Sequence, residues 1–87
     1  MYEWDEFKRD RAHAKHGVDF SVVYDFDWAT ARTTLDHRRD YGEARFVTFG
    51  FIGVRLHALA WTPRGEKIRI VMLRKANARE RKRYEQT

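Results

Sequence analysis

Three consecutive β-prone segments joined by tight turns constrain the fold more than any other feature of this sequence. The segments are residues 45–52, 54–62 and 66–73, and the turns fall at Gly53 and at Pro63-Arg64-Gly65. Strands joined by turns this short pair as antiparallel neighbours. The pattern therefore predicts an antiparallel meander, to which the β-prone residues 30–35 add a short fourth strand.

Helices are predicted at both ends of the chain. Residues 5–16 begin at a suitable N-cap, Asp5, and stop before Gly17, which suits the C′ position. A second, short helix is predicted over residues 19–26. The residues expected to face inward are Trp4, Phe7, Arg11 and Ala14 on the first helix and Phe20, Val23, Tyr24 and Phe26 on the second. A last helix starts at residue 77 or 78, where Asn77 and Glu80 have the spacing of a capping box.

These elements predict a single α+β domain over residues 1–87, with N-terminal helices on a four-stranded antiparallel sheet and a C-terminal helix. Period-two alternation gives the sheet two different faces. On the last strand Ile68, Ile70 and Met72 oppose Lys67, Arg69, Val71 and Leu73, and on the strand before it Arg55, His57, Leu59 and Trp61 oppose Val54, Leu56, Ala58 and Ala60. We expect the helices to bury the apolar face with Ile68, Ile70 and Met72, and the face that carries Arg and His to stay partly open.

The composition excludes several classes of protein. The chain has six Phe, four Tyr and three Trp, whereas intrinsically disordered chains have few aromatic side chains. The absence of cysteine excludes a disulfide scaffold and a thiolate zinc site. The longest apolar run, residues 49–54, is far shorter than the ~18 residues of a membrane span, and the acidic N-terminus lacks a signal-peptide pattern. We therefore expect a cytoplasmic protein that does not contact a membrane.

Positive charge is concentrated at the C-terminal end. Residues 1–63 hold nine basic and ten acidic side chains, whereas residues 64–87 hold nine basic and three acidic ones. Such a segment favours binding to a polyanion such as a nucleic acid. A charged, solvated terminal helix explains the same pattern, and charge alone does not decide between the two.

Four common kinds of site are not supported by the sequence. The chain has no glycine-rich phosphate loop of the Walker or dinucleotide type. His13 and His16 are three residues apart, but the cationic side chains around them disfavour a metal ion. Ser21, the one serine, has no adjacent histidine for a triad, and a domain of this size offers no cleft for a carboxylate pair. No metal or cofactor is expected.

What remains is a set of basic residues that are close in sequence and are predicted to converge at one edge of the sheet. They are Arg64, Arg69, Arg74, Lys75 and Arg79. Arginine suits a phosphate because its planar guanidinium binds two oxygens at once. Trp61 and Tyr84 offer faces on which an unpaired base could stack, although a tryptophan at this position is more often part of the rim of a core.

Such residues could cleave RNA without a metal ion. The ribose 2′-hydroxyl would attack the adjacent phosphate, and Arg and Lys would stabilise the charge that develops on the phosphoryl oxygens. A base must take the 2′ proton and an acid must protonate the leaving 5′ oxygen. His57 is the strand histidine suited to this work, and a surface histidine without a catalytic role is the alternative.

Three blocks of residues resemble the BrnT family of toxins and span nearly the whole chain. They are Trp4-Asp5-Glu6 with Lys8 and Lys15-His16-Gly17-Val18-Asp19-Phe20; Asp40-Tyr41-Gly42-Glu43 with Arg45-Phe46; and Trp61-Thr62-Pro63-Arg64-Gly65, Ile68-Arg69-Ile70, Arg74-Lys75-Ala76, Arg79-Glu80-Arg81 and Tyr84-Glu85. The loop from His37 to Tyr41 is richer in arginine than the family pattern, and residues 25–36 match it only loosely.

The resemblance implies the toxin of a type II toxin–antitoxin system, with a fold similar to that of RelE-type ribonucleases and an activity that cleaves RNA and stops translation. It implies a BrnA-type antitoxin that binds DNA, dimerises and forms a complex with two copies of each chain, so that the toxin meets DNA only through its partner. Lys8 and His16, from the first block, become further candidates for RNA binding. The rival hypothesis is a non-catalytic module that binds a nucleic acid or a protein partner through the same basic surface.

Overall fold

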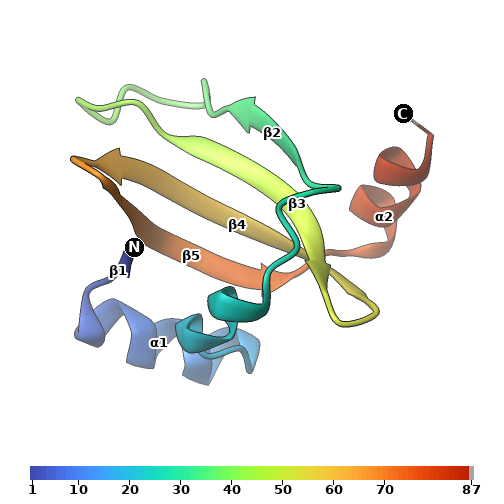
Figure 1. Cartoon of the computed structure of the whole chain (residues 1–87), viewed down its shortest axis with the longest axis horizontal. Helices are drawn as coiled ribbons and strands as arrows, with labels where there is room; N and C mark the ends of the chain where they lie inside the picture. Colours follow the sequence, from blue (N-terminus) through green and yellow to red (C-terminus); the bar gives the residue numbers. More distant parts are fainter. Residues whose placement is uncertain (87) are drawn as a thin grey trace.

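The computed structural model describes residues 1–86, which form a five-stranded sheet with helices against one side and at one end (Figure 1). The elements are β1 (Tyr2–Glu3), α1 (Glu6–His16), the 3-10 helix η1 (Phe20–Asp25), β2 (Arg32–Leu35), β3 (Phe46–Ile52), β4 (Arg55–Arg64), β5 (Lys67–Lys75) and α2 (Ala78–Glu85). The α+β class is as predicted. The strands start and end within about two residues of the predicted positions, and β4 continues through Pro63 to Arg64.

The sheet is mixed, which corrects the prediction of four antiparallel strands. The strand order is β1-β5-β4-β3-β2, and β2 to β5 are antiparallel as expected. The additional strand, β1, pairs in parallel with β5 through Tyr2 and Glu3, and the N–H of Ile68 donates to the carbonyl of Met1 at 2.8 Å. A strand of two residues is too short to show alternation, so no sequence pattern predicted it.

The helix ends follow the capping residues that the sequence predicts. The Asp5 carboxylate accepts from the backbone N–H of Phe7 at 2.8 Å, and Gly17 ends α1 in the left-handed conformation, φ 71°. Asn77 and Glu80 form the complete capping box of α2. The second helix, η1, starts after Asp19 as predicted but is a single 3-10 segment rather than an α-helix.

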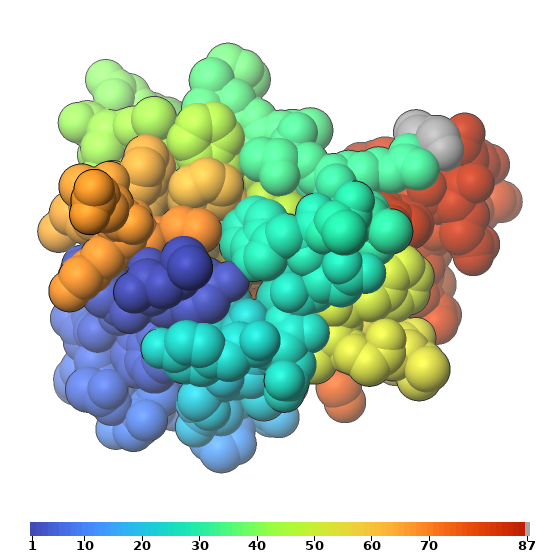
Figure 2. Space-filling model, viewed as in Figure 1, coloured from blue at the N-terminus to red at the C-terminus, as the bar shows by residue number. Residues whose placement is uncertain are grey.

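The core lies between the sheet and the segment formed by α1 and η1. Val18, Phe20 and Val23 from this segment pack on Leu59, Ile70 and Leu73 of the sheet, and all six are buried. The space-filling view shows residues near the N-terminus (blue) and around η1 (cyan) covering the middle of this side of the sheet (Figure 2). Each such side chain stabilises the fold by about 1.5–3 kcal/mol through burial.

The inward stripe predicted for the first helix is wrong except at Trp4, which packs against the core and meets Phe20 edge to face. Phe7 is 64% exposed, Arg11 and Ala14 are also exposed, and α1 has no fully buried residue. The η1 side chains fill the core in its place, and α1 contributes only Ala12, which is partly buried against it. Tyr24, expected to point inward, is 65% exposed and meets Tyr2 edge to face.

A bulge in β5 reverses the predicted faces of that strand beyond Ile70, whereas Ile68 and Ile70 face the core as predicted. Ala60 pairs with Met72, but Trp61 pairs with Ile70, so Val71 is an extra residue in β5. An extra residue reverses the alternation beyond it. Ile70 is buried under the helices as predicted, whereas Met72 turns to the opposite face, and Leu73 replaces it in the core.

The two faces of β4 are also the reverse of the prediction. Leu59 and Trp61 pack with the helices, so His57, which alternates with them, lies on the covered side of the sheet and is 6% exposed. Ala58 and Ala60 belong to the uncovered side. The polar residues Arg55 and His57 misled the prediction, because they lie at the end of β4 beyond the centre of the core.

No helix in residues 1–86 is long and apolar enough to cross a membrane.

Gly50 of β3 provides a direct test of this packing. A Cβ atom at this position would lie 2.5 Å from Cζ of the buried Phe26 ring. Gly50→Ala should therefore destabilise the fold by roughly 1–3 kcal/mol through overpacking, measured by urea denaturation. Val54→Ala, at a fully exposed position in the same hairpin, should leave the stability within about 0.5 kcal/mol. Equal stability of Gly50→Ala and the wild type would contradict the position of Phe26.

Candidate functional site

The side of the sheet opposite α1 and η1, here called the open face, holds the candidate site. Its floor consists of Val47, Phe49 and Met72, which are partly exposed. These side chains line a hollow together with Arg38 from the β2–β3 loop, Arg74 from β5 and Arg83 from α2, here called the arginine hollow. Three guanidinium groups thus come together from elements far apart in the sequence.

Arg38 is held by a buried carboxylate. Its Nε donates to Oδ1 of Asp36 at 3.0 Å and its Nη2 donates to Oδ2 at 2.9 Å. The Asp36 side chain is 2% exposed and also accepts from the Tyr41 hydroxyl at 3.0 Å. The Arg38 hydrogen bonds, with a smaller contribution from Tyr41, hold the pKa of Asp36 far below its usual range. This ion pair orders the loop and fixes the direction of Arg38.

Arg74 is held in the same way from the other side of the hollow. Its Nη1 and Nη2 donate to the two carboxylate oxygens of Glu80 at 2.7 and 2.8 Å. These bonds raise the pKa of Arg74 and lower that of Glu80. Glu80 also accepts from the backbone N–H of Asn77 at 2.9 Å, so one carboxylate both caps α2 and orients Arg74.

Arg83 and His37 also line the arginine hollow, together with Thr34, Leu35, Asp36 and Glu80. Both are exposed, and within the described residues the guanidinium of Arg83 has no hydrogen-bond or ion-pair partner, although its charge lowers the pKa of Glu80. Two of the three arginines are thus paired with and oriented by carboxylates. In the part of the chain that the structure describes, the charge of the third, Arg83, is not neutralised by an ion pair, so the hollow has a net positive charge.

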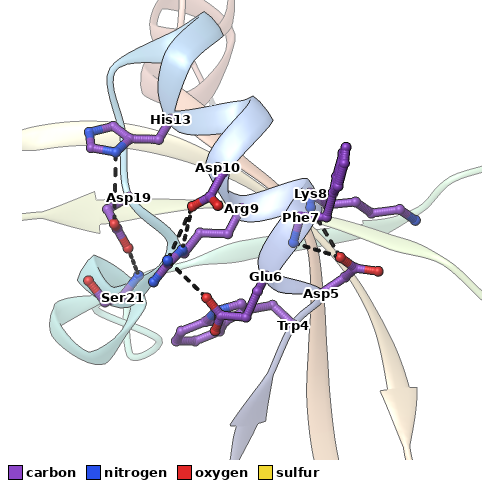
Figure 3. Close-up of polar contacts among 10 residues, drawn as sticks. All are labelled: Trp4, Asp5, Glu6, Phe7, Lys8, Arg9, Asp10, His13, Asp19 and Ser21. Atoms are coloured by element: carbon purple, nitrogen blue, oxygen red, sulfur yellow. Dashed lines mark hydrogen bonds and ion pairs between the residues drawn. The ribbon is translucent and has the colours of Figure 1, made fainter.

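A second basic groove runs between α1 and the outer edge of β5. It is lined by Lys8, Arg11, Lys15, His16 and the bulge residue Val71. Burial, and then the charges of Lys15 and Arg74, lower the pKa of His16. Figure 3 shows Lys8 pointing away from the ion pairs of Arg9 with Glu6 and Asp10. The structure therefore brings the two predicted residues Lys8 and His16 together.

The five basic residues predicted to converge do not form one cluster. Arg64 pairs with Lys67 at one end of the β4–β5 hairpin, whereas Arg74 pairs with Ala58 toward the other. Arg64 Nη2 lies 3.6 Å from Oε1 of Glu43. Lys75 and Arg79 are exposed near the start of α2. Of the five, only Arg74 lines the arginine hollow.

Arg69 shares the open face with Arg74 but lies near β1. Its Nη1 donates to Oε2 of Glu3 at 2.7 Å, and this bond lowers the pKa of Glu3. Its charge is therefore paired at the edge of the sheet rather than in the arginine hollow.

The aromatic candidates and His57 have different surroundings. Trp61 stacks on Phe46, with ring centroids 4.9 Å apart, and donates to Thr48 Oγ1 at 2.8 Å, which corresponds to the core-rim alternative. His57 is buried on the covered side, where burial lowers its pKa and Nδ1 lies 2.9 Å from the carbonyl of Arg55. Tyr84 borders the open face, and its hydroxyl donates to the carbonyl of Thr30 at 2.6 Å.

Sequence reasoning missed Arg38, Arg83 and Phe49. The spacing of Asp36 and Arg38, two residues apart in a loop that also holds Tyr41, was a usable signal, because an aspartate beside a turn commonly accepts from the backbone two residues on. Arg83 was not distinguishable from the other charged residues of α2. Phe49 could be assigned to the open face only after the structure showed which side of β3 the helices cover.

These features define a class of protein: a small α+β domain whose open sheet face presents convergent arginines, as proteins that bind phosphate backbones do. Within residues 1–86, no group of three or more His, Cys, Asp or Glu side chains could hold a metal ion. The family model described as "Ribonuclease toxin, BrnT, of type II toxin-antitoxin system" matches residues 4–80. The chain therefore belongs to the BrnT family of ribonuclease toxins. A comparison with curated proteins finds no matching relative.

The ion pair of Asp36 predicts a pH-dependent stability. Because Arg38 lowers the pKa of Asp36 in the folded state, the ionised carboxylate stabilises the fold above the pKa of about 3.9 of an unfolded aspartate, and this contribution is lost in more acidic solution. Asp36→Asn should therefore lower the melting temperature at pH 7, and the difference from the wild type should shrink toward pH 3. Asp25→Asn, at an exposed position, is the control. A difference independent of pH would argue against the ion pair.

Proposed function

We propose that this chain is an endoribonuclease that cleaves RNA without a metal ion and thereby stops translation, with the arginine hollow as its active site. The observation that carries the proposal is the convergence of Arg38, Arg74 and Arg83 on one open sheet face. Its family supplies the RNA target, and the hollow offers the positive charge that a scissile phosphate requires. The most direct place of action is the cytoplasm, where messenger RNA is translated.

The arginines would act mainly on the transition state. When the ribose 2′-oxygen attacks the phosphorus, negative charge grows on the non-bridging oxygens, and donors already aimed at that position stabilise it. Arg38 and Arg74 each use two N–H groups on a carboxylate. A guanidinium has five N–H donors, so both retain donors for a phosphate while their direction stays fixed.

The remaining basic surfaces would bind the RNA on either side of the scissile phosphate. The groove with Lys8 and His16 lies between α1 and β5, on the covered side of the sheet, and the charge of Arg74 still reaches His16. Arg69 lies on the open face near β1. We assign to these residues contacts with the RNA backbone, which position a strand without reading its sequence. Arg64, Lys75 and Arg79 would extend this surface at its margins.

Cleavage in the presence of a chelator tests the proposed reaction. Purified protein incubated with RNA in EDTA should release fragments that end in a 2′,3′-cyclic phosphate, because the 2′-oxygen becomes bonded to phosphorus as the 5′-oxygen leaves. A non-catalytic nucleic-acid-binding module would shift the RNA in a gel and leave it intact, and that result would support the rival hypothesis.

Replacing Arg83 tests the location of the site. Arg83→Ala removes a charge-assisted contact worth about 1.5–3 kcal/mol, so kcat/KM for RNA cleavage should fall roughly 10- to 150-fold. The matched control is Arg81→Ala, which removes the same charge from an exposed position of α2 outside the arginine hollow. Equal activity of both variants would place the active site elsewhere.

We also propose that a BrnA-type antitoxin inhibits the chain by covering α2 and the arginine hollow, in a complex with two copies of each protein. Residues 64–87 hold nine basic and three acidic side chains, and an acidic antitoxin segment would associate with them quickly and in a defined orientation. Since Arg83 belongs to both α2 and the hollow, a partner bound to this helix would also close the site.

Charge reversal of α2 tests this interface. The double variant Arg79→Glu with Arg83→Glu should bind the cognate antitoxin at least tenfold more weakly, and the dependence of affinity on salt should become shallower, because fewer opposite charges meet. Arg11→Glu, on the exposed surface of α1, is the control, and calorimetry at two salt concentrations is the measurement. Unchanged affinity and salt dependence would place the interface on another surface.

A further inference from the structure

A second hollow lies beside the arginine hollow, between β2, β3 and α2. Its lining consists of Arg32, Thr34, Phe49, Glu80, Arg83 and Tyr84. Thr34, Phe49, Glu80 and Arg83 line both hollows, so the two form one continuous depression. We call the second part the α2 hollow.

The floor of the α2 hollow is the aromatic ring of Phe49, which lies between Arg32 on β2 and small residues on β4. Phe49 pairs across the sheet with Ala58, and the next position on the same face pairs Val47 with Ala60. Alanines at both neighbouring positions of β4 leave one side of the Phe49 ring without a tall neighbour. The ring is partly exposed, although the two alanines beneath it are buried.

The wall of the α2 hollow is fixed by Tyr84. Its hydroxyl donates to the carbonyl of Thr30 at 2.6 Å, its ring meets Phe51 edge to face with centroids 5.6 Å apart, and Arg32 lies over its face at 4.8 Å from the ring centroid. These contacts join α2 to β2 and β3. The separation of Phe49 from the helix is therefore set before any ligand arrives.

We propose that the α2 hollow is a binding site for one unpaired nucleobase of the RNA, stacked on Phe49 with its acceptor edge toward Arg83. This inference rests on the proposed function, because it places the base of the nucleotide whose phosphate occupies the arginine hollow. A flat apolar floor beside a cluster of cations matches a nucleotide, whose base has two π faces and whose phosphate is anionic. Base–aromatic stacking does not depend on sequence, so the floor supplies affinity for any base.

The rim of the α2 hollow selects among the bases. Both carboxylate oxygens of Glu80 are already engaged by Arg74 and the backbone of Asn77, so Glu80 does not read donors on a base. Arg83 offers donors only, and a guanidinium pairs best with the O6 and N7 acceptors of guanine. Guanine is therefore the preferred base, and adenine, which presents a donor next to N7, is disfavoured.

Nucleotide binding tests this site without relying on cleavage. Wild-type protein is titrated with 5′-GMP, 5′-AMP, 5′-CMP and 5′-UMP, and with ribose 5-phosphate, which lacks a base, while the Thr34 methyl signal is followed by NMR. We expect 5′-GMP to bind at least tenfold more tightly than ribose 5-phosphate and to shift the Thr34 methyl through the ring current of the base. Ribose 5-phosphate should bind weakly and leave that signal in place.

Two variants test the contributions of the floor residue Phe49 and the rim residue Arg83 separately. Phe49→Leu keeps an apolar side chain but removes the ring, so the advantage of 5′-GMP over ribose 5-phosphate should fall to less than threefold. Arg83→Lys should retain phosphate binding and reduce the preference for 5′-GMP over 5′-AMP. Phe7→Leu, at an exposed position of α1, is the matched control and should behave as the wild type. If Phe49→Leu fails to fold, the comparison of 5′-GMP with ribose 5-phosphate on the wild-type protein still tests whether the α2 hollow binds a base.

The outcomes are distinguishable from failure of the proposed function. Equal binding of 5′-GMP and ribose 5-phosphate, or an unchanged Thr34 methyl signal, would overturn the nucleobase site even if the protein cleaves RNA. Protection of the Thr34 signal by the antitoxin alone, with no effect of any nucleotide, would overturn it in favour of a protein partner. Absence of RNA cleavage by the wild type would instead refute the active site proposed above.

Discussion

The extra residue Val71 in β5 decides which side chains the open face can offer. In an uninterrupted strand, Arg74 would share a face with Ile68 and Ile70 and would point into the core. Because the bulge reverses the alternation after Ile70, Arg74 emerges on the open face with Arg69, while Leu73 turns inward and is buried. The convergence of Arg74 with Arg38 and Arg83 therefore depends on a local defect in the sheet. Val71 itself faces the basic groove beside α1, so the same defect shapes both candidate RNA surfaces.

Paired carboxylates turn flexible arginines into fixed donors. An arginine side chain loses about 2 kcal/mol of rotamer entropy when it is immobilised, and here Asp36 and Glu80 impose that order within the folded protein. A phosphate that meets Arg38 or Arg74 finds the guanidinium already oriented, which is the condition for stabilising a transition state without reorganisation. The cost is that each carboxylate cancels part of the positive charge. Arg83 and Arg32, which have no carboxylate within ion-pair distance in the described residues, restore the net positive potential.

Local sequence signals, such as capping residues and turn glycines, predicted the elements of the fold. The site depends on contacts between distant parts of the chain, which local signals do not predict. Asp5, Gly17 and Asn77 cap helices as the sequence indicated, and the glycines at positions 53 and 65 lie at the two hairpin turns. The faces of β4 were predicted wrongly because Arg55 and His57 suggested an open side. The faces of β5 beyond Ile70 were predicted wrongly because period-two reasoning assumes an unbroken strand, and the bulge at Val71 has no sequence signature of its own. Arg74 was named among the candidates from its residue type and position. Its partners in the hollow are Arg38, from the β2–β3 loop, and Arg83, from α2. These residues meet Arg74 only when the chain folds.

Helix α2 belongs both to the arginine hollow and to the surface proposed to bind the antitoxin. None of its residues is fully buried, so its position on the sheet comes from a few specific contacts rather than from a core of its own. Glu80 binds Arg74, and Tyr84 reaches Thr30 and Phe51. Both contacts lie on the side of α2 that borders the hollows, and the rest of the helix surface is basic and exposed. A partner bound to that outer surface would act on Arg74 through Glu80, without contacting Arg74 itself. Any shift of α2 moves Glu80 and Arg83 together, and with them the direction of Arg74.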